Sequence, residues 1–274
     1  MRADMALDLF ATEFRTFQGY SALKDGFSEL VRRLENEFQQ RGGTILRQHE
    51  LVRCLSPLEA IFLKGKPSDG PEREEVHMKA RAFVLAVPVS SLAGLDPFRS
   101  LPWLKHLRME PLLRVYAAFP VSPRGGKAWF ADVPKFATPA ANRFFIPGDV
   151  STGSCQISYT DSTDAQPLIK LLNEEGVAAL GAHLMETLRV ALNRKDIPDP
   201  LFVKAHAWPQ AVTYWLPGDY DPFKVSKEAS RPLPKEMPGW FLCGESYSTR
   251  QCWVEGALEH ADMTLGLIKK FMKH

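Results

Sequence analysis

The chain has 274 residues and nearly balanced charge, with 34 lysines and arginines against 32 aspartates and glutamates. A net charge of +2 gives no electrostatic drive toward nucleic acid, so we expect no nucleic-acid partner. Hydrophobic residues make up 45% of the chain and charged residues 24%, which is typical of a globular protein with a large core.

The cysteines and histidines show no metal-binding spacing. The four cysteines form no C-x-x-C pair, and the seven histidines form no H-E-x-x-H motif. We therefore expect no metal site, and reduced thiols as in the cytoplasm. No apolar run approaches the ~20 residues of a membrane span, and no signal-peptide pattern is present. These features predict a soluble, cytoplasmic protein without a membrane span.

The first third of the chain mixes helical and strand patterns. Apolar residues recur at helical spacing from Phe27 to Phe38, and a Gly-Gly pair follows them as a helix end. The expected elements are helices within residues 1–18 and before residue 42, strands at 44–55 and 82–87, and a polar loop at 67–75.

The middle of the chain predicts a sheet with one long helix. Residues 97–111 are expected to be irregular or a short helix, and leucines at helical spacing favour a helix over 173–193. Strands are expected at 112–119, 128–131, 143–146, 155–159 and 201–208, and a proline-rich connection at 217–238.

A strand–loop–helix pattern stands near the C-terminus. The apolar run Gly239–Cys243 ends in Gly244-Glu245, crosses a polar loop and continues as a helical pattern from Trp253. Such an arrangement directs the N-terminus of a helix, with its free N–H groups, toward an anionic ligand. The same pattern is also that of a core strand, a turn and a terminal amphipathic helix.

This stretch resembles the closing segment of the FAD-binding domain in flavin amine oxidases. Cys243 replaces the usual Ala of that family, and Cys252 replaces the Gly before the aromatic residue. The resemblance implies that Trp253 forms one wall of an aromatic cage and that the Val254 amide donates to the flavin. It also implies close backbone approach at Gly244.

Further roles follow from the same resemblance. Glu245 would accept hydrogen bonds from ribityl or ribose hydroxyls. Residues 80–88, ending in Pro88, are similar to a family strand that packs beside the cofactor. Residues 19–55 resemble the helix and strand that clamp adenine through the backbone, which places the clamp at Leu51 or Val52.

The middle region resembles the amine oxidoreductases encoded by large DNA viruses. The matching stretches are 143–147, 157–161 and 206–218, and they imply that Tyr214 and Trp215 take part in a substrate cavity. Arg114 stands where the family usually has a lysine that holds a water near the flavin. Arginine stays protonated, so Arg114 can hold a water but cannot act as a base.

The cofactor implied is a non-covalently bound FAD, because Gly218-Asp219-Tyr220 occupies the place of a cysteine-bearing attachment turn. The fold expected is α+β or α/β, with a partial Rossmann-like FAD-binding domain at 1–92 and 237–274. A mixed-sheet substrate domain is expected at 93–236. The function implied is oxidation of a carbon–nitrogen bond in a small amine.

The 274 residues contain no Gly-x-Gly-x-x-Gly motif of the kind that grips the FAD pyrophosphate. We therefore expect a partner chain or a second copy to complete the site, and exposed apolar faces at 10–17 and at Leu85. The alternatives are a non-catalytic binding or structural component, for example in a virus particle, and a protein that holds another planar ligand.

Overall fold

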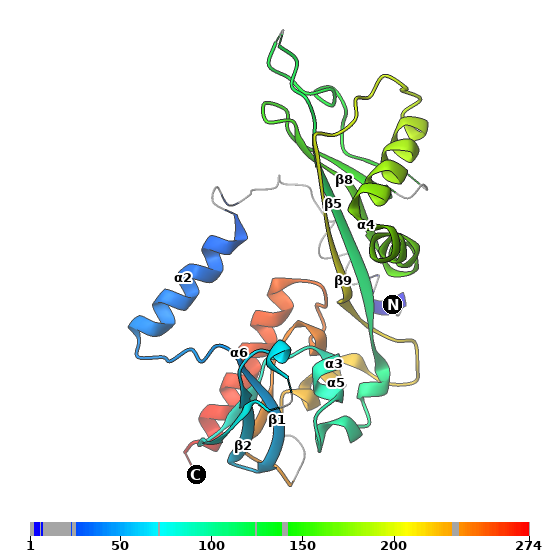
Figure 1. The fold of residues 1–274 in the computed structure, drawn as a ribbon. Coiled ribbons are helices and arrows are strands. Elements are labelled where there is room, and N and C mark those ends of the chain that lie inside the picture. Colours follow the sequence, from blue (N-terminus) through cyan, green and yellow to red (C-terminus); the bar gives the residue numbers. More distant parts are fainter. Residues whose placement is uncertain are drawn as a thin grey trace. The chain divides into compact units, whose positions relative to one another are not determined.

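The computed structural model describes residues 3–5, 7, 23, 26–70, 72–123, 125–138, 142–231 and 236–273. The chain divides into two compact units, which are described separately (Figure 1). The first is built from the chain up to Leu107 and from Trp215 onward, and the second is Arg108–Tyr214. Most of the helix expected within residues 1–18, and the apolar face expected at 10–17, lie outside the described residues.

The first unit holds two small sheets and the longer helices α2 and α6. Strands β1 (His49–Ser56), β2 (Glu59–Lys64) and β3 (Glu74–Lys79) form an antiparallel sheet, and β4 (Phe83–Leu85) pairs in parallel with β10 (Trp240–Leu242). The helices are α2 (Phe27–Gln40), α3 (Val89–Ala93), α5 (Pro222–Ala229) and α6 (Val254–Phe271), and the 3₁₀ turns are η1 (Pro67–Asp69), η2 (Phe98–Ser100), η3 (Leu104–His106) and η4 (Glu245–Tyr247).

The core of the first unit forms around the β4–β10 pair. Trp240 is fully buried, its ring stacks on Phe83 at 4.2 Å, and its indole N–H donates to the Ser56 carbonyl. Thr264 in α6 donates to the Leu242 carbonyl at 2.9 Å. The helix that follows the C-terminal loop is thus tied directly to the strand that precedes it.

The second unit is one five-stranded sheet with α4 on one face. The sheet order is β6 (Phe136–Ala137), β7 (Phe144–Asp149), β8 (Ser154–Asp161), β5 (Leu107–Ala118), β9 (Phe202–Trp215), and the helix is α4 (Ser162–Ala191). Alternate residues of β5, among them Leu113 and Val115, are buried in one cluster with Leu184 and Leu188 of α4. The opposite face of β5 carries Arg114.

The mixed α/β class predicted from the sequence is confirmed, and several element predictions are wrong in detail. Residues 128–131 form turns with a single bridge between Val121 and Ala128, because aromatic packing rather than a ladder buries Trp129 and Phe130. The connection at 217–238 contains α5, whose first amides are capped by the Asp221 carboxylate.

Two further expectations are corrected. The helix expected at 173–193 begins eleven residues earlier, at Ser162, and its two halves meet at Gly176, where a φ of 87° breaks the helical backbone. Leu85, expected to be exposed, is only 5% exposed because β10 and its surroundings cover it, whereas the adjacent Val84 is 47% exposed.

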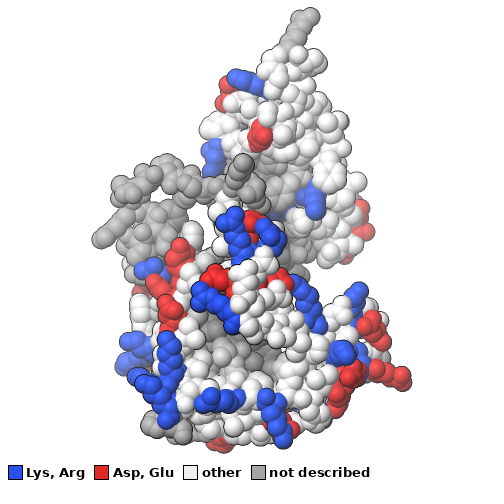
Figure 2. Space-filling model, turned by 90° about the vertical axis from the view of Figure 1, so that its left-hand side faces the viewer, with Lys and Arg blue, Asp and Glu red and all other residues white. Residues whose placement is uncertain are grey.

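Helix α2 presents its apolar stripe to solvent. Its hydrophobic residues follow the predicted helical spacing, and each is at least 41% exposed: Phe27, Leu30, Val31, Leu34 and Phe38. Glu29 pairs with Arg32 and Arg33 on its polar side. Acidic and basic side chains lie among one another on the face shown in Figure 2. Within the described residues, no helix is long and apolar enough to cross a membrane.

Asn142 joins the sheet of the second unit to α4. It is fully buried, donates to the carbonyls of Ile157 and Leu184 at 2.9 and 3.0 Å, and accepts from Thr187 at 2.7 Å. The two bonds that Asn142 donates are buried and the one from Thr187 is partly buried, so loss of the Asn142 side chain leaves buried groups unsatisfied.

We predict that Asn142→Ala lowers the free energy of unfolding by about 2–3 kcal/mol, measured by urea denaturation. Thr187→Val, which removes only one of the three bonds, should cost about 1 kcal/mol. Equal losses for the two variants would contradict the bridging role of Asn142.

Candidate functional site

The loop between β10 and α6 is built on two unusual backbone conformations. Gly244, directly after the strand, has a φ of 138°, and a side chain there would meet only the Tyr247 ring, at 4.0 Å. Cys252 has a φ of 73°, a conformation that residues other than glycine adopt at a cost. The backbone at Gly244 is therefore accessible, and the chain turns sharply at Cys252 before Trp253 and α6.

The first turn of α6 lies against this loop. A Cβ on Gly256 would be 2.0 Å from the Arg250 carbonyl oxygen, so the position admits no side chain. No side chain caps the helix, and Trp253 and Val254 at its start are 38% and 63% exposed. The first N–H groups of the helix are therefore available to solvent or a ligand.

Glu245 holds the loop closed. Its Oε1 accepts a hydrogen bond from the Cys252 amide at 2.5 Å, and Ser246 lies 3.4 Å from Oε2. Burial raises the pKa of the Glu245 carboxyl above its ordinary value, and these hydrogen bonds oppose the shift. One oxygen of Glu245 is thus committed to the protein, and binding of a ribityl or ribose hydroxyl stays a prediction.

Trp215 is hydrogen-bonded to the same loop. Its side chain is fully buried, its indole N–H donates to the Ser248 carbonyl at 2.9 Å, and its backbone N–H donates to the Gln251 side chain at 2.8 Å. The structure gives Trp215 a packing role, and lining of a substrate cavity stays a prediction. Gln251, which also donates to the Ser246 carbonyl, went unnoticed in the sequence because a single amide in a polar loop has no distinctive pattern.

The predicted adenine clamp lies on an edge strand. Leu51 is in register with Phe62 of β2, and the register shifts by one residue at Val52, forming a β-bulge. Both residues are half-buried. Pro88 is exposed and precedes α3, and the neighbouring Val87 carbonyl accepts a hydrogen bond from Tyr247. These residues belong to the first unit, with Gly244, Glu245, Trp253 and Val254.

The second unit contains Arg114 and the half-buried Tyr214. The Arg114 guanidinium lies 4.8 Å from the ring centre of Tyr159, and its Nε is buried with no hydrogen-bond partner among the described residues. Tyr116 follows on the same face of β5 and contacts His206, which stacks on Trp208. An unsatisfied buried donor in an aromatic surface is an atom that a water or ligand can satisfy.

The sequence profile of the flavin-containing amine oxidoreductases matches residues 1–264. The chain belongs to this family. Among solved structures, it is similar to a protein from Exiguobacterium sp. 255-15 that is assigned as a protoporphyrinogen oxidase, with a TM-score of 0.68 and 13% identity. That match covers 96% of this chain and 55% of the other, so the chain spans about half the length of the solved relative.

No curated protein matches the chain. Family membership confirms the resemblance drawn from the sequence at the level of the flavin-containing oxidoreductases, for which a flavin is the expected cofactor. The narrower likeness to virus-encoded members stays a prediction.

The residues of the first unit fit one end of such a cofactor. Uncapped N–H groups at the start of α6 suit the electron-rich edge of a flavin, and Gly244 leaves open space beside the backbone. No described group of three or more metal-ligating side chains stands close enough together to bind a metal ion.

We predict that Gly256→Ala destabilises the protein by about 1–3 kcal/mol and loosens the loop, because its methyl group would overlap the Arg250 carbonyl. Gly266→Ala, in the same helix but with no atom within 4 Å, is the matched control and should stabilise it by about 0.5–1 kcal/mol. Thermal unfolding checks both. Tolerance of Gly256→Ala would contradict the packing of the first turn.

Glu245 gives a pH-dependent term in stability. Its folded pKa is raised above the ordinary 4.5, so its contribution is complete below pH 4.5 and is lost as pH rises through the raised value. Glu245→Gln should remove this loss. The free energy of unfolding of the variant, relative to that of the wild type, should therefore increase as pH rises. Urea midpoints from about pH 4 to pH 7 measure it. The exposed Glu228→Gln is the control, and parallel profiles for wild type and Glu245→Gln would refute the assignment.

Proposed function

We propose that the protein is an FAD-dependent oxidoreductase that oxidises a carbon–nitrogen bond of a small amine. The observation that carries the proposal is the start of α6, where uncapped N–H groups follow a strand, an open glycine and a closed loop. Membership in the flavin-containing amine oxidoreductases supports the same cofactor.

The cofactor end is assigned to residues 1–92 and 237–274, and the binding is non-covalent. The Val254 amide would donate to the isoalloxazine edge, which the positive end of the α6 dipole favours. Gly244 would admit the backbone close to the cofactor, while Glu245 keeps the loop in place. Either Leu51 or Val52 would clamp adenine through the backbone, and the bulge at Val52 favours that residue. Pro88 would line the cofactor's other side.

The substrate end is assigned to residues 93–236, with Arg114, Tyr214 and Trp215 alongside Trp253. When bound, the flavin supplies the hydride acceptor for the reaction. Arg114 remains protonated, so its buried Nε–H would hold a water or a polar substrate atom rather than remove a proton. The half-exposed Trp253 ring would form one wall around a neutral amine.

A further segment would complete the site by gripping the pyrophosphate. Two surfaces of the first unit support an added segment: the exposed apolar stripe of α2, and β4, which within the described residues pairs only with β10. The segment would come from the same polypeptide, a partner chain or a second copy. If none binds, the alternative is a non-catalytic binding or structural component, as in a virus particle.

We expect the purified chain to retain flavin absorbance near ~450 nm after addition of FAD and removal of unbound FAD by gel filtration, and an amine substrate to bleach it without oxygen. Arg114→Met should slow the bleaching by about tenfold with FAD binding unchanged, since one buried donor is lost. Arg114→Lys, which keeps a cationic donor, should lose less.

Absence of FAD binding under all conditions would overturn the oxidase proposal and favour the structural alternative. Equal bleaching by wild type and Arg114→Met would instead remove Arg114 from the site while leaving the cofactor assignment intact.

A further inference from the structure

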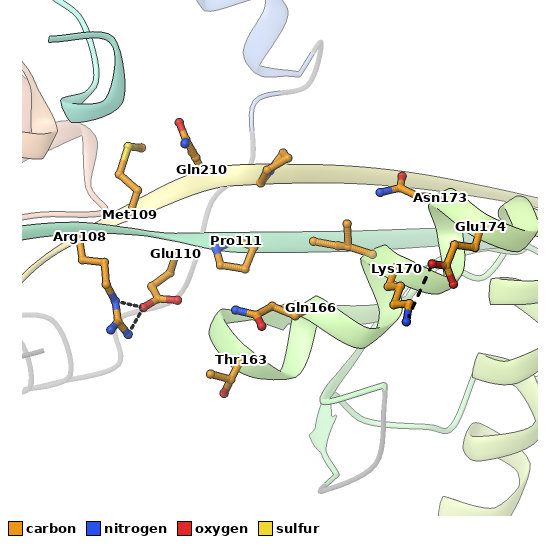
Figure 3. Close-up of a pocket in the computed structure, with 12 residues that line it drawn as sticks. Arg108, Met109, Glu110, Pro111, Thr163, Gln166, Lys170, Asn173, Glu174 and Gln210 are labelled. Carbon is orange, nitrogen blue, oxygen red and sulfur yellow. Dashed lines mark hydrogen bonds and ion pairs between the residues drawn. The ribbon is translucent and has the colours of Figure 1, made fainter. Parts of the chain in front are cut away.

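Helix α4 lines a pocket with each of its two halves, which meet at Gly176. The first half lines the pocket of about 780 Å³ in Figure 3, together with β5 and β9, the strands that carry Arg114 and Tyr214. That pocket is therefore assigned to the proposed substrate end. The second half of α4 and strand β6 line another pocket of about 650 Å³, which we call the β6–α4 groove. The two pockets share no residue.

The helical wall of the β6–α4 groove is a single stripe of α4, about 12 Å long from the rise per residue of an α-helix. Its residues recur at positions i, i+3, i+4, i+7 and i+8: His183, Glu186, Thr187, Val190 and Ala191. Val190 is 76% exposed, the highest value for a large hydrophobic side chain in the described part of the chain. The stripe therefore offers apolar surface that a ligand can cover.

The other wall of the groove is β6, the outermost strand of its sheet. The Phe136 ring stacks on the fully buried Phe145 at 5.3 Å, which holds the strand in place. The Thr138 amide donates to the Arg143 carbonyl at 2.7 Å, so by alternation the N–H and C=O of Ala137 are directed away from β7. Strand β6 thus presents an open backbone edge at Ala137, which lines the groove.

Glu186 supplies the carboxylate of the groove. Its side chain is exposed, and it forms no hydrogen bond or ion pair with the residues that the structure describes. No three metal-ligating side chains stand together in that part of the chain, so a metal ion is a poor counterpart. A lysine or arginine side chain can supply charge-assisted hydrogen bonds to such a carboxylate.

An extended peptide matches the backbone edge, the apolar surface and the charge together. Its backbone can pair with the open edge at Ala137, as added strands do at sheet edges. Its residues advance by about 3.4 Å each, so about four of them span the helical stripe. Because alternate side chains of a strand point to one side, two side chains of the peptide would face the groove.

We propose that the β6–α4 groove binds an extended segment of another protein, which adds a strand to β6. The segment places an apolar side chain against Phe136 and Val190, and a lysine or arginine, two residues away in its own sequence, on Glu186. The groove contains no residue assigned to the redox site. The proposal therefore stands independently of the proposed oxidase function.

Selection of a phage-displayed library of random nonapeptides on the full chain tests the proposal. We expect the enriched peptides to carry a lysine or arginine two residues from an apolar residue, because these positions share one side of a strand. The strongest binder is then synthesised with one N-methyl group at each backbone amide in turn, and its affinity is measured by fluorescence polarisation. Methylation at alternate amides should weaken binding at least about tenfold, because only every second amide faces β6.

Variants of the groove separate its two contacts. Val190→Asp should abolish peptide binding, whereas Leu201→Asp, the matched control at a 74% exposed position outside the groove, should leave it unchanged. Glu186→Gln should weaken binding about threefold at low salt, as expected for a screened surface pair. Glu175→Gln, at an exposed position of the same helix outside the groove, should leave it unchanged.

The proposal would be overturned by a selection without an enriched motif, by N-methyl effects that do not alternate, or by equal losses for Val190→Asp and Leu201→Asp. Light scattering tests a second copy as the occupant. Self-association that Val190→Asp abolishes, with no peptide bound, would replace the proposed partner by a second copy of the chain.

Discussion

The close contact between the first turn of α6 and the loop before it fixes the geometry of the candidate cofactor site. Position 256 admits no side chain because the Arg250 carbonyl lies where a Cβ would be. The loop is held by two buried hydrogen bonds of Trp215, one of them to Gln251, whose groups would be costly to leave unpaired, and by an exposed bond from the Cys252 amide to Glu245. The start of α6 is therefore a rigid feature, presented without a capping side chain of its own.

The two faces of the sheet in the second unit present different environments. One face buries Leu113 and Val115 beneath α4. The other face carries an unsatisfied arginine beside aromatic rings. Because successive residues of a strand point to opposite faces, one strand supplies both environments from neighbouring positions.

Much of the first unit could be predicted from local patterns. The strands at 83–85 and 240–242 follow from apolar runs bounded by glycine or proline, and the helix from 254 follows from an amphipathic pattern. The family resemblance located the α6 start, and the matching profile confirms that resemblance.

The remaining features depend on contacts between distant residues. Trp215 meets Gln251 across 36 residues of sequence. Residues 128–131 have a strand-like composition, yet their aromatic rings pack without a ladder partner. The early start of α4 at Ser162 is disguised in the sequence by a proline at position 167.

The central claim is that the N-terminus of α6 forms part of a flavin-binding site whose geometry is already present before FAD binds. Amide hydrogen exchange of the chain with and without FAD tests it most directly, because the first-turn amides are the proposed donors. FAD should slow exchange at residues 253–256 and leave the second half of α4 unchanged. Bound FAD with unaltered exchange at residues 253–256 would contradict the claim and place the cofactor elsewhere.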